Sequence, residues 1–98
     1  MTDHVTAIAG STERLSCSAV GHPAPQIVWY KDGVMLTVDA QQGHIVIDDV
    51  WNSMKTTSQL VLRGLVPADS GRYRCTALNS HGNVSFLYSL LVLGQFLQ

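Results

Sequence analysis

The chain has 98 residues, which is the size of one domain. Hydrophobic residues make up 46% of it, enough for a packed core, whereas charged residues make up 13%, about half of the usual share of roughly 25%. This balance excludes a disordered chain, and with a net charge of −1 and scattered basic residues the sequence has no electrostatic footprint for nucleic acid.

No stretch of the sequence has the pattern of a signal peptide or the length of a membrane span. The longest apolar run, 86–93, is too short to cross a bilayer, so we expect no direct membrane insertion. Met1 stands directly before an edge-like segment. We therefore expect the sequence to be a piece of a longer chain that carries neighbouring domains.

Short segments of alternating apolar and polar residues follow one another along the whole chain, with turn residues between them. They predict strands at 5–9, 14–20, 26–31, 34–38, 44–51, 56–62 and 84–93, and a further strand that includes 72–77. Turn residues cluster at 10–12, 21–25, 31–33, 52–55, 67–71 and 79–83. No helical period appears, so the fold class we predict is an all-β sandwich of two sheets.

Two cysteines and an intervening tryptophan mark the centre of the predicted core. Cys17 and Cys75 lie 58 positions apart, with Trp29 between them. A bridge closing a loop of that length would stabilise the fold by roughly 4 kcal/mol. The alternative is two buried thiols that act as small hydrophobic side chains. Alternation also turns Leu60 and Leu62 toward this core.

From 5 to 93 the chain resembles the immunoglobulin superfamily and, within it, the intermediate or I-set type. The resemblance rests on Gly10, Leu15-Ser16-Cys17, Gly21-x-Pro23-x-Pro25, Ile27-x-Trp29-Tyr30-Lys31-Asp32-Gly33, Leu60-x-Leu62, Asp69-Ser70-Gly71-Arg72-Tyr73-Arg74-Cys75-Thr76-Ala77-Leu78-Asn79, Gly82 and Leu90-x-Val92. It implies an antiparallel Greek-key sandwich with strands A, A′, B, C, C′, D, E, F and G. It also implies an inter-sheet Cys17–Cys75 pair under Trp29, and a Tyr73 hydroxyl bonded to backbone a few residues upstream.

Two features depart from that family pattern. Members often pair the equivalent of Asp69 with an arginine near the start of strand D, and here His44 is the nearest candidate. The stretch from Trp29 to Cys75 is several residues longer than is common, and we expect the extra length to extend the D–E hairpin, 44–62, with Trp51 and Met54 near its tip. This tip is a second candidate surface, because an exposed tryptophan is a good anchor for a partner. In the alternative interpretation, Trp51 caps the core.

The sequence offers no arrangement of residues that indicates catalysis. Its four histidines (His4, His22, His44 and His81) have no ligand spacing, so no metal is expected. There is no Gly-x-Ser-x-Gly motif and no glycine-rich phosphate loop. We therefore expect no catalytic residues, no cofactor and no enzymatic activity. Asn83-Val84-Ser85 fits the N-glycan acceptor pattern, which makes Asn83 a glycosylation candidate at the expected F–G turn.

Alternation turns an apolar and cationic set of side chains outward on strands C, F and G. We call this surface the C-F-G face and predict that it is an interface; its candidate residues are Val28, Tyr30, Arg72, Arg74, Leu87 and Leu91. A protein partner or a second copy of the chain would cover it. The alternative is that a neighbouring domain or the segment 95–98 covers it.

These observations predict one immunoglobulin-like domain at 1–94 followed by a tail or linker at 95–98. As the resemblance implies, its function is protein–protein recognition in an extracellular or cell-surface receptor, adhesion molecule or secreted binder. The alternative is a structural and docking domain of a giant muscle protein, in the cytoplasm of the sarcomere. The core residues do not distinguish the two.

Overall fold

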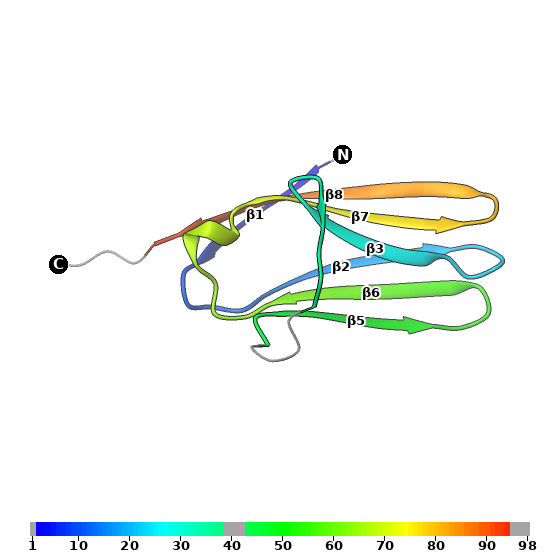
Figure 1. The fold of residues 1–98 in the computed structure, drawn as a ribbon, viewed down its shortest axis with the longest axis horizontal. Helices are drawn as coiled ribbons and strands as arrows, with labels where there is room; N and C mark the ends of the chain where they lie inside the picture. The colour runs from blue at the N-terminus through cyan, green and yellow to red at the C-terminus, as the bar shows by residue number, and fades with distance from the viewer. Residues whose placement is uncertain (1, 39–42, 95–98) are drawn as a thin grey trace.

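The computed structural model describes residues 2–38 and 43–94, and in it the chain forms two layers of β-strands (Figure 1). The proposed tail 95–98, Met1 and residues 39–42 lie outside the described residues. The elements are β1 (Thr2–Ile8), β2 (Glu13–Val20), β3 (Gln26–Lys31), β4 (Val34–Met35), β5 (Ile45–Trp51), β6 (Lys55–Leu62), the 3-10 helix η1 (Pro67–Asp69), β7 (Gly71–Asn79) and β8 (Gly82–Leu93).

The strands form a five-stranded and a three-stranded sheet. The first has the order β1-β8-β7-β3-β4 and the second the order β2-β6-β5. Strand β1 runs parallel to β8, and the other paired neighbours are antiparallel. The two sheets lie one above the other in Figure 1. The predicted all-β sandwich is confirmed.

Three elements differ from the sequence-based expectation. Strand β4 ends at Met35 rather than near 38, because the chain then crosses to the other sheet to start β5 (Figure 1). Strand β1 pairs with β8 along its whole length, so no separate strand A is found within residues 2–38 and 43–94. The turn between β7 and β8 is only two residues long, because Asn79 already pairs with Gly82.

Local sequence accounts for the tight connection between β3 and β4. Lys31 pairs with Val34, so Asp32 and Gly33 alone form the turn. Both have positive φ, 49° and 84°, which is the conformation of a type I′ turn. Glycine adopts it without steric cost, and aspartate tolerates it better than most residues. The Asp-Gly pair therefore fixes the register of this hairpin.

The core lies between the sheets and is centred on Trp29. Cys17 and Cys75 form a disulfide that joins β2 to β7, and both residues are buried. The side chains that are less than 2% exposed include Trp29, Tyr73, Leu60, Leu62 and Leu65. Glu13, which alternation turns inward, sits half-buried at the rim of the sheet. The core holds the two sheets at a fixed separation and so fixes the surfaces that they present.

Candidate interaction surface

Trp29 ties β3, one of the three strands that carry the C-F-G face, to the opposite sheet. It lies opposite Cys75 in the β3–β7 ladder, and its indole N–H donates to the Ser58 hydroxyl oxygen at 2.8 Å. Its ring also stacks on Tyr88, with ring centroids 6.3 Å apart. The Tyr88 hydroxyl donates to the Ser16 carbonyl on β2. These bonds hold β3 and β8 against the second sheet, so their outer side chains form a rigid surface.

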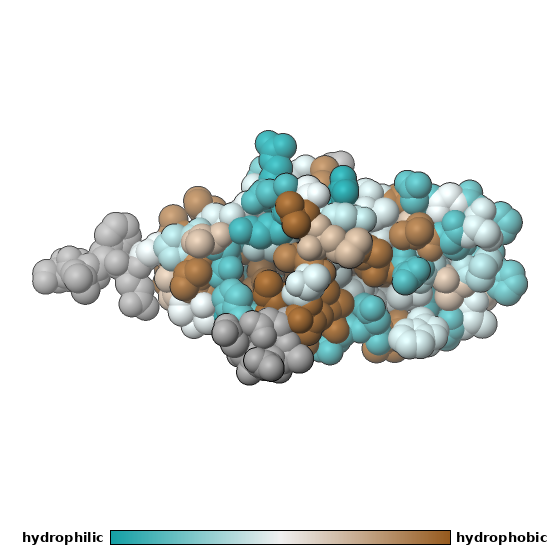
Figure 2. Space-filling model, viewed as in Figure 1, coloured by the Kyte–Doolittle hydropathy of each residue, from teal (hydrophilic) through white to brown (hydrophobic). Residues whose placement is uncertain are grey.

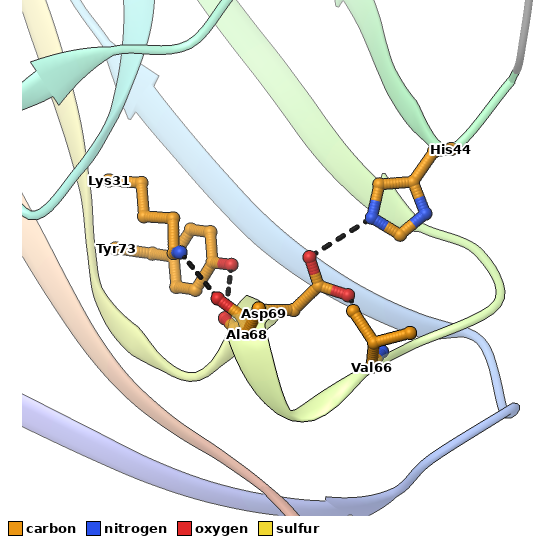
Figure 3. A network of polar contacts seen from close by, with 6 residues as sticks. All are labelled: Lys31, His44, Val66, Ala68, Asp69 and Tyr73. Atoms are coloured by element: carbon orange, nitrogen blue, oxygen red, sulfur yellow. Dashed lines mark hydrogen bonds and ion pairs between the residues drawn. The ribbon is translucent and has the colours of Figure 1, made fainter.

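A second set of polar contacts fixes the corner before β7 (Figure 3). The Tyr73 hydroxyl donates to the Asp69 carbonyl at 2.5 Å, four residues upstream. The Asp69 carboxylate accepts the Val66 N–H through Oδ2 and meets His44 Nε2 through Oδ1 at 3.0 Å. Lys31 donates to the Ala68 carbonyl from β3. The structure thus places His44 beside Asp69, as the sequence predicts.

Burial and nearby carboxylates raise the pKa of Tyr73, the tyrosine at this corner. Removal from water raises the pKa of Tyr73 most, and the charges of Asp69 and Asp32 raise it further. The pKa of Tyr88 is raised as well, first by burial and then by the charge of Asp3, although its bond to the Ser16 carbonyl acts in the opposite direction. Both tyrosines are therefore structural hydrogen-bond donors, not proton carriers.

Four of the six C-F-G face candidates lie in two adjacent rows across the sheet. Tyr30 pairs with Arg74, and Arg74 pairs with Leu87, so these three side chains are direct cross-strand neighbours. The Arg74 guanidinium lies over the Tyr30 ring, 4.4 Å from its centroid. Val28 lies in the next row, opposite Thr76. The structure thus brings together an aromatic ring, a cation and two aliphatic side chains.

The other two candidates lie further along the strands. Arg72 pairs with Ser89, one row beyond Arg74. Leu91 is four residues from Leu87 on β8, or about 13 Å at the usual rise per residue, and Ser89 separates the two. Leu91 instead pairs with Thr6 of β1. The C-F-G face is therefore compact around Arg74, with Leu91 at its margin.

One residue of this face was missed by the sequence analysis. Met35 pairs with Tyr30 and is 57% exposed, so it extends the row of Tyr30, Arg74 and Leu87 by one strand. The Asp-Gly turn contains the signal, because a two-residue hairpin fixes which residues of the next strand face Tyr30. Counting outward from that turn would have found Met35.

The D–E tip places Trp51 and Met54 in solvent. Trp51 is 70% exposed and Met54 is 56% exposed. Trp51 pairs with buried Thr56, so alternation does turn it toward the interior, but β5 is the edge strand of its sheet and Trp51 remains exposed there. The interpretation of Trp51 as a cap on the core is therefore wrong, and its indole is accessible. In the view of Figure 2, apolar residues gather toward the middle of the molecule, and the hairpin ends at the right are mixed with polar residues.

Asn83 lies inside β8 and not in the turn where it was expected. It is exposed and pairs with Leu78, and Ser85 of the same triplet shares a 2.9 Å hydrogen bond with Thr76. Because side chains alternate along a strand, Asn83 points to the same side of the sheet as Leu87. The glycosylation candidate and the candidate interface therefore occupy one face.

Within residues 2–38 and 43–94, no group of three or more His, Cys, Asp and Glu side chains could hold a metal ion. The same part of the chain has no helix long and apolar enough to cross a membrane.

Comparisons with known proteins agree with this architecture. The leucine-rich repeats and immunoglobulin-like domains protein 3 of Mus musculus is 40% identical over 92 residues, which cover 91% of this chain and 7% of that protein. The myoblast growth factor receptor egl-15 of Caenorhabditis elegans is 34% identical over 89 residues, which cover 89% of this chain and 8% of that protein. The chain thus spans only a small part of these relatives.

A solved structure extends the likeness to muscle proteins. The titin M10–obscurin-like 1 Ig complex matches with a TM-score of 0.78 and 25% identity, over 97% of this chain and 90% of that one. Domains similar to this one thus occur in a receptor and in a complex of muscle Ig domains. The sequence model of the Immunoglobulin I-set domain matches residues 1–92. The chain therefore belongs to the immunoglobulin I-set domain family.

Proposed function

We propose that the chain is a non-catalytic recognition module that binds a protein, either a different partner or a second copy of itself, through the C-F-G face. The observation that carries the proposal is the row formed by Tyr30, Arg74 and Leu87. Tyrosine and arginine are the residue types that contribute most often to binding at the centre of interfaces. Here they are direct neighbours, with aliphatic side chains beside them.

The contact between Arg74 and Tyr30 prepares this face for binding. The guanidinium carbon is held 4.4 Å from the ring centroid, so the cation is already positioned against the aromatic ring before a partner arrives. Less side-chain freedom is then lost on association. Met35 on one side of Tyr30 and Leu87 on the other side of Arg74 provide apolar area at the rim of this row.

Three observations support an extracellular or cell-surface location. The Cys17–Cys75 disulfide is typical of chains that fold in an oxidising compartment. Asn83 is exposed, as an N-glycan acceptor must be, and glycosylation there belongs to this proposal. The similarity to a growth factor receptor supports the same location.

The second candidate function is that of a structural and docking domain in a muscle protein, in the cytoplasm. The likeness to the titin M10–obscurin-like 1 complex favours it, because the match covers nearly the whole of both chains. In this case the domain would act as a spacer and a docking unit, and Cys17 and Cys75 would be reduced in the cell.

Sedimentation equilibrium over a wide concentration range tests the face directly. We would compare the wild type with Leu87→Lys, Leu91→Lys and a matched control, Val20→Lys, at an exposed position of the other sheet. A dimer that is lost in Leu87→Lys, weakened in Leu91→Lys and kept in Val20→Lys supports binding of a second copy. A dimer that persists in both β8 variants contradicts the proposed face.

If every variant is monomeric, a second copy is excluded, and the four proteins are compared for binding to the surface of cultured cells. Binding that is lost only in the β8 variants then supports a different partner. Equal binding by all four proteins contradicts the C-F-G face.

A further inference from the structure

Strand β5 forms an open edge of the three-stranded sheet. It pairs with β6 on one side, and no strand within the described residues pairs with its other side. The Arg63 N–H donates to the His44 carbonyl, and the Asn52 N–H donates to the Lys55 carbonyl. In an antiparallel ladder the bonded pairs recur at every second residue. The backbone groups of Ile45, Ile47, Asp49 and Trp51 therefore point away from β6, toward the open edge.

A groove of about 330 Å³ lies beside the Trp51 end of this edge. Pro25, Ile27 and Thr56 line it and are all buried residues. The Thr56 hydroxyl donates to the Pro25 carbonyl at 2.5 Å, which closes the base of the groove by joining β6 to the segment just before β3. Asp49 and Trp51 line the same groove from β5 and are both exposed. The groove thus has a fixed apolar base and an accessible wall.

The wall of the groove has the chemistry of a cation site. In the part of the chain that the structure describes, neither Asp49 nor its neighbour Asp48 is in an ion pair. An indole ring attracts an ammonium or guanidinium group over its face. A carboxylate accepts a charge-assisted hydrogen bond from the same cationic group. The apolar base suits the methylene stem of the same side chain. Lysine and arginine side chains provide the cation, the hydrogen-bond donor and the methylene stem.

We propose that β5 receives an extended segment of a partner protein that adds a strand to the open edge and places a lysine or arginine in this groove. Addition of a strand draws its affinity from backbone hydrogen bonds and its specificity from pockets for alternate side chains. Directly opposed residues point to the same face of a sheet. The basic residue is therefore the one opposite Asp49 or Trp51.

This site is separate from the C-F-G face, which lies on the other sheet. It needs neither Arg74 nor Leu87, and binding at β5 stays intact in Leu87→Lys whatever that variant does to association.

Selection from a random nonapeptide library displayed on phage tests the proposal. The wild-type domain is the bait, and phage that also bind Trp51→Ala are removed. We expect the selected peptides to be enriched in lysine or arginine at one position. For the strongest of them, affinity should fall about tenfold or more in Trp51→Ala and about tenfold in Asp49→Asn.

The chain supplies a matched control for each variant. Val50 is as exposed as Trp51, and Asp48 carries the same charge as Asp49, but both point to the opposite side of the sheet. Val50→Ala and Asp48→Asn should leave the affinity within about twofold. Amide shifts in NMR titrations should centre on Ile47, Asp49 and Trp51. N-methylation of the peptide at the backbone positions that face β5 should remove binding.

Several outcomes overturn the proposal. They are a selection with no peptides or with no basic enrichment, equal loss of affinity in the Asp48 and Asp49 variants, and amide shifts centred away from β5. Binding that survives backbone N-methylation would show that no strand is added, which also contradicts it.

Discussion

His44 and Asp69 are 25 residues apart in the sequence, and their side chains meet at 3.0 Å at the corner between the sheets (Figure 3). Asp69 connects three segments from this position. Its Oδ1 contacts His44 near the start of β5, its Oδ2 accepts the Val66 N–H, and its backbone carbonyl accepts the Tyr73 hydroxyl of β7. The same residue thus joins the beginning of the D–E hairpin to the strand at the middle of the C-F-G face.

The first prediction concerns this corner. Asp69→Ala removes both carboxylate contacts and should lower the free energy of unfolding by about 2–3 kcal/mol, whereas His44→Ala leaves the carboxylate bonded to the Val66 N–H and should lower it by about 1 kcal/mol. Urea denaturation at neutral pH measures both. Asp48→Ala, which changes an exposed carboxylate without a partner in the described chain, is the control and should have little effect. Equal stabilities for Asp69→Ala and Asp48→Ala would contradict the role of the corner.

The second prediction is a loss of stability at alkaline pH. Because the pKa of Tyr73 is raised in the folded state, the unfolded chain releases its proton first as the pH rises above about 10. The contribution of the neutral phenol is fully present below that pH, and it is lost at about 1.4 kcal/mol per pH unit above it. Urea titrations at several alkaline pH values should therefore give a shallower slope for Tyr73→Phe than for the wild type. The same slope in both would show that another group controls the alkaline transition.

The third prediction concerns the disulfide. Reduction of the Cys17–Cys75 bond should lower the free energy of unfolding by roughly 4 kcal/mol, because the unfolded chain gains the freedom of a long loop. Thermal melts with and without a reducing agent measure the change. A Cys17→Ala/Cys75→Ala variant, which has no bond to reduce, should melt at one temperature under both conditions. If reduction leaves the wild-type melting temperature unchanged, the bridge does not stabilise the fold.

Much of the fold follows from alternation, because a buried strand shows its two faces directly in the sequence. Alternation assigned Leu60 and Leu62 to the interior, and both are buried. Alternation predicts which face of the sheet a side chain occupies, but not whether other residues cover that side chain. Trp51, Val84 and Phe86 are turned inward by parity and are nonetheless 70%, 47% and 42% exposed. Each of the three lies on a strand where it forms the edge of its sheet, next to a buried residue of the inner strand, and which strands end at an edge is a property of the packed fold.

The pairing register between strands also could not be predicted from the sequence. The position of Leu91 relative to Arg72 depends on the two-residue turn between β7 and β8, and the sequence offers five consecutive turn-forming residues there, 79–83. Ser58 was missed for a related reason. A serine in an alternating strand shows no sign that it faces a tryptophan from another sheet, since that pairing exists only after the sheets have packed.

The buried contact between Trp29 and Ser58 gives the fourth prediction. Ser58→Ala leaves the indole N–H without its acceptor in a dry site, which should cost about 1–3 kcal/mol of stability. Ser18→Ala, an exposed serine of β2, is the matched control and should stay within about 0.5 kcal/mol of the wild type. Chemical denaturation of the wild type and the two variants measures these differences in the free energy of unfolding. A Ser58→Ala variant as stable as Ser18→Ala would show that the indole N–H finds another acceptor.

The last prediction joins the glycan acceptor to the C-F-G face. Asn83-Val84-Ser85 is the single acceptor triplet of the sequence, and Asn83 lies on the same side of β8 as Leu87, four residues or about 13 Å away. A glycan is bulky and hydrated, so it would shield one end of the face and leave the row around Arg74 accessible.

Protein secreted from eukaryotic cells should carry one N-glycan by mass spectrometry, and Asn83→Gln should carry none. Association through the face should be tighter in Asn83→Gln, by up to about tenfold. Ser85→Ala removes the acceptor while keeping the asparagine, so it should match Asn83→Gln. An unmodified wild type after secretion would remove Asn83 from the proposal, and equal association by all three proteins would place the glycan away from the interface.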